Sequence, residues 1–102
     1  MIREDKLITQ SPYAKARRQS ILKKSKHVLI IDDQSTGRTI LERIIQQIAD
    51  NIVVTSLSSP GEGLIWLNDN EPDLIVTDYR MPNMNGVEFI QKIRVMPHCQ
   101  TV

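Results

Sequence analysis

The chain has 102 residues, of which 40% are hydrophobic and 25% are charged, and this fits one small soluble domain. Its single cysteine, Cys99, excludes an internal disulfide framework and fits a reducing compartment. No wholly apolar run is longer than the four residues 28–31, which is too short to span a membrane, and the N-terminus lacks the apolar segment of a secretory signal. We therefore expect a cytoplasmic protein with no membrane contact.

The net charge of +1 is unevenly distributed along the chain. Residues 1–26 carry eight Lys or Arg against two acidic residues, whereas residues 27–102 carry five basic and ten acidic residues. We expect 1–26 to be a basic N-terminal extension, partly helical after Ser11-Pro12 or flexible, ahead of a folded domain over 27–102. A nucleic-acid or anionic-surface contact is the alternative for the extension, but Tyr13 is its lone aromatic residue and no base-reading motif accompanies it.

The first predicted strand covers residues 27–31, a short β-branched run typical of a strand buried on both faces. A helix is expected to begin at Ser35 or Thr36, because apolar residues then recur at intervals of three and four. The apolar positions that define this helix face are Ile40, Leu41, Ile44, Ile45 and Ile48.

A second strand is predicted over residues 52–56, followed by Ser59-Pro60 as the cap of a short helix. In this helix Leu64, Ile65 and Leu67 are expected to point inward. The helix also carries Trp66, which we interpret as a packing residue rather than a cofactor contact.

The third strand is predicted over residues 73–78, after the break at Pro72. Asn85-Gly86 then leads into a helix that ends near Pro97. The expected inner face of this helix consists of Val87, Phe89, Ile90 and Ile93. Three successive strand–helix units predict an α/β fold with parallel strands and right-handed crossovers.

Three carboxylates follow the ends of two predicted strands. Asp32 and Asp33 come directly after the first strand, and Asp78 ends the third. In a doubly wound sheet, ligands bind outside the carboxyl ends of the strands, and neighbouring strands lie about 4.8 Å apart. If the first and third strands are neighbours, all three side chains enter one crevice, where hard oxygen ligands suit Mg²⁺. Ordinary helix caps and loop acids are the alternative.

The segments "VLIIDDQ" (residues 28–34) and "DLIVTDYRMPNMNGVEFIQKIR" (residues 73–94) resemble the receiver domain of two-component response regulators, the CheY-like family. The resemblance covers about residues 27–102. It implies a flavodoxin-like, doubly wound parallel sheet, incomplete here, with its three strands in the order 2-1-3.

The resemblance also implies a role for each matching residue. Asp78 matches the phosphoacceptor, which takes a phosphoryl group from a sensor histidine kinase or a phosphotransfer protein. Asp33 matches the direct Mg²⁺ ligand, and Asp32 matches the acid that holds metal-bound water. The backbone carbonyl of Arg80 matches the remaining protein ligand. Such a module is a phosphoacceptor and not an enzyme, and it relays its signal to an output domain.

The family pattern continues with a fourth strand ending in Ser or Thr and a fifth ending in Lys, whereas this sequence ends at Val102. We expect the chain to represent about the first three fifths of a receiver. The open edge of the third strand then predicts a homo-oligomer. Without the hydroxyl and the lysine, small phosphoryl donors are expected to label this chain weakly or not at all.

Several other interpretations remain open at this point. The chain could act as an interaction module that is not phosphorylated. A phosphatase of the haloacid-dehalogenase type would need an aspartate at position 80, which is Arg80, and a flavodoxin-like nucleotide site would need more glycines than Gly37 after the first strand. His98-Cys99 is interpreted as a loop, since two adjacent residues make a poor metal site.

The output of the whole protein is not encoded in these residues. The sequences of the predicted strands and helices are similar to those of receivers joined to cyclic-di-GMP phosphodiesterases of the HD-GYP kind. Nucleic-acid binding is expected only through an output domain outside this sequence, if at all.

Overall fold

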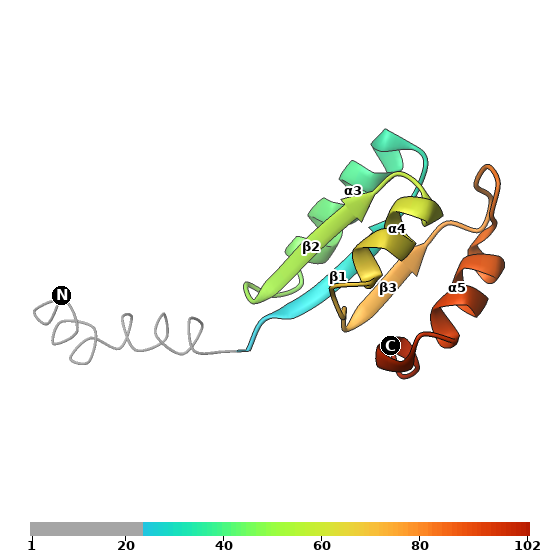
Figure 1. The fold of residues 1–102 in the computed structure, drawn as a ribbon. Helices are drawn as coiled ribbons and strands as arrows, with labels where there is room; N and C mark the ends of the chain where they lie inside the picture. The colour runs from blue at the N-terminus through green and yellow to red at the C-terminus, as the bar shows by residue number, and fades with distance from the viewer. Residues whose placement is uncertain (1–23) are drawn as a thin grey trace, which may run out of the picture.

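A computed structural model describes residues 24–102, so most of the predicted basic extension lies outside the described residues. The elements succeed one another as three strand–helix units and a final short turn of helix (Figure 1). In chain order they are β1 (Lys26–Ile31), α3 (Ser35–Gln46), β2 (Ile52–Leu57), α4 (Pro60–Leu67), β3 (Leu74–Thr77), α5 (Gly86–Arg94) and the 3-10 helix η1 (Pro97–Cys99).

The three strands form one parallel sheet with β1 in the middle and the order β2-β1-β3. β1 pairs with β3 from Val28 opposite Leu74 to Ile31 opposite Thr77. Helix α3 covers one face of the sheet, and α4 and α5 cover the other (Figure 1). The predicted α/β class, parallel pairing and 2-1-3 order are confirmed.

The central strand supplies the core of both layers, since its side chains alternate between the two faces. Leu29 and Ile31 pack among buried residues of α4, α5 and η1. Val28 and Ile30 pack on the opposite face against Ile45 of α3. The residues from 28 to 31 are each 5% exposed or less, which is why this stretch is apolar at every position.

The predicted cap of α4 is present, and α5 begins at Gly86, where Asn85-Gly86 was expected to lead into a helix. The Ser59 hydroxyl accepts from the Glu62 N–H at 3.1 Å, and Pro60 occupies the start of α4. Asn85 and Glu88 form a reciprocal capping box at the start of α5, with bonds of 2.9 and 3.0 Å. The Ser58 hydroxyl also bonds Glu62, at 2.6 Å, and this hydrogen bond lowers the pKa of Glu62.

Two residues predicted to point inward are exposed instead. Ile65 is 71% exposed and Val87 is 53% exposed. Ile65 lies two positions after Gly63, which packs against Ile31 of the core. Val87 lies two positions before Phe89, which is fully buried. Two positions on a helix of 3.6 residues per turn are about 200° apart, so both members of such a pair cannot face the sheet.

Helix α3 also exposes part of its predicted apolar face. Ile40 and Ile44 are each 53% exposed, and Ile48 lies beyond the end of the helix and is 70% exposed. Ile45 is buried and Leu41 packs beside it against the sheet. The apolar arc of α3 is therefore wider than the stripe that β1 and β2 cover.

The remaining residues singled out from the sequence have structural contacts. The rings of His27 and Trp66 meet edge to face at 5.0 Å. The His98 ring donates to the Leu67 carbonyl at 2.6 Å, and burial raises the pKa of the Cys99 thiol. His98 and Cys99 therefore sit in a short 3-10 helix packed on the core rather than in the predicted loop. No helix in the described part of the chain is long and apolar enough to cross a membrane.

The assignment of buried and exposed isoleucines is testable with a matched pair of substitutions. Ile93 is 1% exposed on α5, whereas Ile65 is 71% exposed on α4. We expect Ile93→Val to lower the free energy of unfolding by about 1 kcal/mol, because it removes a buried methylene. Ile65→Val is expected to change it by less than about 0.5 kcal/mol. Urea unfolding followed by circular dichroism measures both, and equal effects would contradict the packing described.

Candidate metal centre

The acidic residues of the site are placed by the pairing of β1 with β3. Ile31 lies opposite Thr77 at the last paired position, and the Asp78 N–H donates to the Ile31 carbonyl at 2.9 Å. The residues that come next after each strand, Asp32 and Asp33 after β1 and Asp78 after β3, therefore lie at the same edge of the sheet.

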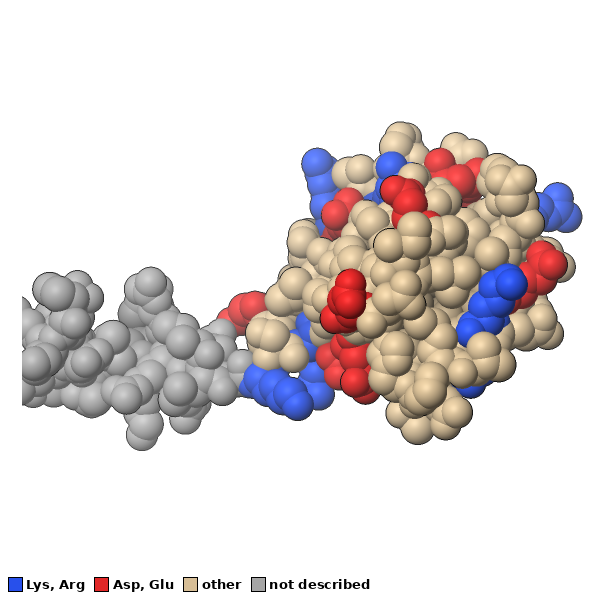
Figure 2. Space-filling model, in the orientation of Figure 1, with Lys and Arg blue, Asp and Glu red and all other residues tan. Residues whose placement is uncertain are grey.

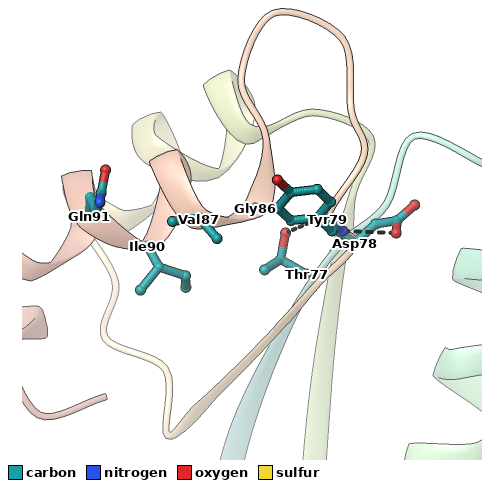
Figure 3. A pocket seen from close by; sticks show the side chains of 7 residues that line it. All are labelled: Thr77, Asp78, Tyr79, Gly86, Val87, Ile90 and Gln91. Carbon is teal, nitrogen blue, oxygen red and sulfur yellow. Dashed lines mark hydrogen bonds between the residues drawn. The ribbon is translucent and has the colours of Figure 1, made fainter.

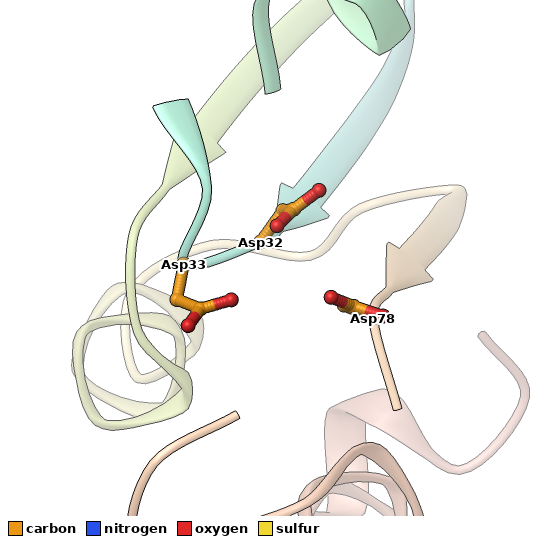
Figure 4. A group of neighbouring side chains, drawn as sticks. All are labelled: Asp32, Asp33 and Asp78. Atoms are coloured by element: carbon orange, nitrogen blue, oxygen red, sulfur yellow. The ribbon is translucent and has the colours of Figure 1, made fainter. Parts of the chain in front are cut away.

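The three carboxylates converge at this edge. One oxygen atom from each of Asp32, Asp33 and Asp78 lies within 4.8 Å of the others. The carboxylates of Asp33 and Asp78 turn toward one another across the crevice (Figure 4). Asp32 is buried, with 9% of its surface exposed, Asp33 is half-buried and Asp78 is exposed. Among residues 24–102 this is the one group of three or more acidic, histidine or cysteine ligands.

Backbone hydrogen bonds fix two of these carboxylates. Asp32 Oδ1 accepts from the Gln34 N–H at 2.9 Å, and Asp78 Oδ1 accepts from the Tyr79 N–H at 2.9 Å. The Arg38 guanidinium donates to the backbone carbonyl of Asp32 at 2.7 Å. The sequence alone did not reveal the roles of Gln34 and Arg38, because a backbone donor has no residue signature and Arg38 could equally have been a solvated surface residue.

The segment after Asp78 turns sharply before α5 begins. Asn83 has a φ of 72°, a left-handed conformation that asparagine tolerates better than most residues. The Gly86 N–H donates to the Tyr79 carbonyl at 2.8 Å, and a Cβ on Gly86 would lie 2.5 Å from the Asp78 carbonyl oxygen. Glycine at position 86 therefore allows α5 to approach the backbone of the candidate phosphoacceptor. Arg80 is exposed in this segment.

A groove of about 330 Å³ lies beside the end of β3, between residues 77–79 on one side and α5 on the other. Its apolar walls are Val87 and Ile90, and Thr77 and Tyr79 lie at its β3 side (Figure 3). The Asp78 carboxylate points away from these apolar side chains. The groove and the acidic crevice thus open on different sides of the end of β3.

Acidic and basic side chains are interspersed over the face of residues 24–102 drawn in Figure 2. That face presents no broad basic surface of the kind that binds nucleic-acid phosphates.

Comparison with known proteins gives the family. The model of the response regulator receiver domain matches residues 28–102. The chain is 38% identical over 71 residues to the cyclic di-GMP phosphodiesterase response regulator RpfG of Xanthomonas campestris, and the match covers 70% of this chain and 19% of RpfG. It is 34% identical over 79 residues to the probable chemotaxis protein CheY of Rhizobium etli, covering 78% of this chain and 60% of that protein.

The shared segment makes up a different fraction of each relative. The nitrate/nitrite response regulator NarL of Escherichia coli is 37% identical over 67 residues, which are 66% of this chain and 31% of NarL. The chain thus spans between a fifth and three fifths of these relatives. The chemotaxis response regulator CheY4 of Vibrio cholerae has the same fold, with a TM-score of 0.69 at 25% identity over 76% of this chain and 62% of CheY4. The chain belongs to the response regulator receiver domain family.

The close approach at Gly86 predicts a strong effect of adding one methyl group. Gly86→Ala would place its Cβ against the backbone of Asp78 and Tyr79, at 2.5 and 3.2 Å, so the chain must move. We expect a loss of about 1–3 kcal/mol in the free energy of unfolding, as for other overpacked sites. Thermal or urea denaturation measures it.

Gly61→Ala is the matched control, because the nearest atom to its Cβ would be the Ser59 hydroxyl at 3.9 Å. It is expected to be neutral or slightly stabilising. Equal stability of the two variants would show that Gly86 does not hold the turn against Asp78.

Proposed function

We propose that Asp78 is the phosphoacceptor of this receiver and that Asp32, Asp33 and Asp78 form its Mg²⁺ site with the backbone carbonyl of Arg80. The observation that carries the proposal is the convergence of three carboxylate oxygens within 4.8 Å of one another at adjacent strand ends. The proposed receiver segment is residues 27–102, preceded by the basic extension 1–26.

The donor set fits Mg²⁺ by its chemistry. The three side chains offer hard oxygen ligands, which Mg²⁺ prefers, and a small number of protein ligands leaves positions for water and for a phosphoryl oxygen. Neither a thiol nor an imidazole joins the group among the described residues. When bound, Mg²⁺ would offset negative charge on the transferring phosphoryl group.

The residues around Asp78 suit a nucleophilic role. Its exposed carboxylate is accessible to a partner protein, and the Tyr79 N–H engages Oδ1. Within residues 24–102, Asp78 Oδ2 accepts no hydrogen bond, so this oxygen is available to act as the nucleophile. In the proposed step, this oxygen forms a bond to the phosphorus of a phosphohistidine. The P–N bond breaks, and its electron pair returns to the imidazole nitrogen.

This proposal makes the chain a substrate of phosphotransfer rather than an enzyme. Its partner is a sensor histidine kinase or a phosphotransfer protein, and both are proposed to meet it in the cytoplasm. We propose that an output domain receives the signal. Membership of the family does not identify the kind of output domain, because the relatives named above are a phosphodiesterase regulator, a chemotaxis protein and a nitrate/nitrite regulator.

Two rival functions are disfavoured by particular residues. A haloacid-dehalogenase-type phosphatase needs a general acid at position 80, and Arg80 cannot supply one. A receiver that serves purely as an interaction module would have no use for three charges brought together at a cost in repulsion, yet all three acids are present and converge.

The test is phosphotransfer from a phosphorylated sensor histidine kinase in the presence of Mg²⁺. We expect mass spectrometry to locate one phosphoryl group on Asp78 and to find none on Asp78→Asn. Asp33→Asn is expected to slow transfer by about tenfold or more, since a metal ligand is lost. The exposed Asp69 lies outside the cluster, so Asp69→Asn is the matched control and should behave as wild type. Phosphate on Asp78→Asn, or transfer unaffected by chelation of Mg²⁺, would contradict the proposal.

We further propose that a second copy of the chain covers the outer edge of β3. In the described sheet β3 pairs with β1 on one side, so its other side presents unpaired backbone groups. The groove beside the end of β3 is walled by Val87 and Ile90, and Leu74 on the strand itself is 52% exposed. Two copies related by a two-fold axis would bring the same edge and the same apolar residues together.

Light scattering at micromolar concentration tests this arrangement. The chain is expected to have the mass of a dimer or a higher oligomer, and Leu74→Lys is expected to shift it toward the monomer, because a charge on an edge strand opposes pairing. Ile65→Lys, on an exposed position of α4, is the control and should leave the mass unchanged. A mass equal to one chain for the wild type would exclude the proposed dimer.

A further inference from the structure

The first turn of α3 lies close against the Asp32 carboxylate. Gly37 is the third residue of this helix. A Cβ built on Gly37 would lie 2.6 Å from Asp32 Oδ2 and 3.4 Å from Asp32 Cγ, and these are its nearest atoms. The carboxylate of Asp32 therefore occupies the volume that any other residue at position 37 would need.

Asp32 is held by contacts with α3 and with Gln34, the N-cap residue of that helix. Its Oδ1 accepts from the Gln34 N–H at 2.9 Å, its backbone carbonyl accepts from Arg38 at 2.7 Å, and its Oδ2 lies against Gly37. Asp32 is also the most buried of the three acids, at 9% exposure. Its orientation is thus set by contacts with the helix rather than by solvent.

Gly37 differs from the other glycines in what a side chain would displace. At Gly63 the obstacles are Ile31 and Phe89 of the core, and at Gly86 they are backbone atoms, so a side chain would disturb the fold at both positions. At Gly37 the obstacle is the end of a side chain that can rotate. A larger residue there would be accommodated by moving the carboxylate and not by moving the helix.

We propose that Gly37 is a positioning residue, and that the absence of a side chain there sets the orientation of Asp32 and so the affinity of the site for Mg²⁺. This inference rests on the proposed function. A methyl group at position 37 would push Oδ2 away from the helix, misalign the bond from the Gln34 N–H and leave the carboxylate without a fixed orientation. A ligand or water-holding group that loses its orienting contacts binds metal more weakly.

The helix itself would gain from the same substitution. Alanine is a better helix former than glycine, since glycine loses more backbone freedom on folding. Gly37→Ala should therefore leave the Tm unchanged or raise it while it weakens Mg²⁺ binding. A merely structural role of Gly37 would move both quantities in the same direction.

The experiment compares the full chain with Gly37→Ala and Gly61→Ala. Gly61 lies in the first turn of α4, and the nearest atom to its Cβ position is the Ser59 hydroxyl oxygen at an ordinary contact distance of 3.9 Å, so it shares the helix-propensity gain without the contact with Asp32. ¹H–¹⁵N NMR of each protein, titrated with Mg²⁺, gives the dissociation constant. Without metal, the same spectra report the Gln34 amide, whose hydrogen bond to Asp32 the substitution should disturb.

For Gly37→Ala we expect the Mg²⁺ dissociation constant to rise by about tenfold, the scale seen when residues that orient a metal ligand are changed. The Gln34 amide resonance should shift, and Gly61→Ala should match the wild type in both measurements. Unchanged or tighter Mg²⁺ binding by Gly37→Ala, or an unmoved Gln34 amide, would overturn the inference and leave the proposed function intact. A wild-type chain that does not bind Mg²⁺ would overturn both.

Discussion

The parallel register of β1 and β3 brings three negative charges together at one edge of the sheet. Because Ile31 lies opposite Thr77, the residues that immediately follow the two strands lie next to one another. Carboxylates about 5 Å apart repel by roughly 3 kcal/mol per pair at an effective dielectric near 20. The N–H groups of Gln34 and Tyr79 offset part of this cost for Asp32 and Asp78. A divalent cation would offset the repulsion that remains between the carboxylates. The strand pairing that builds the core therefore also creates the proposed metal site.

Much of this arrangement could be predicted from the sequence because its causes are local or chemical. The apolar run 28–31 indicates a strand covered on both faces, since such a strand is apolar at every position. Ser59-Pro60 and Asn85-Gly86 identify helix starts, because capping depends on residues within one turn. Parallel strands predict that Asp32, Asp33 and Asp78 lie at the same edge of the sheet, and the resemblance to receiver domains implies the 2-1-3 order that makes them neighbours. The observed order β2-β1-β3 and the convergence of the acids agree with these signals.

The parts that escaped prediction depend on packing between elements distant in sequence. Ile65 and Val87 look like core residues, but Gly63 and Phe89 have taken the inward positions on their helices. The exposure of Ile65 cannot be predicted from its residue type, because the close approach of α4 to Ile31 determines which face of the helix points inward. Gly37 also looks ordinary in the sequence, where it is a lone glycine after the first strand. Its proposed positioning role depends on the distance of 2.6 Å between its Cβ position and Asp32 Oδ2.

The central claim is that the acids after β1 and β3 hold one divalent ion. A crystal structure of the chain grown with Mg²⁺ and beryllofluoride tests it most directly. We expect one ion with oxygen atoms of Asp33 and Asp78 at about 2.1 Å, the usual distance for Mg²⁺, and beryllofluoride on Asp78. A crevice without an ion at saturating Mg²⁺, with the carboxylates of Asp33 and Asp78 turned apart, would contradict it.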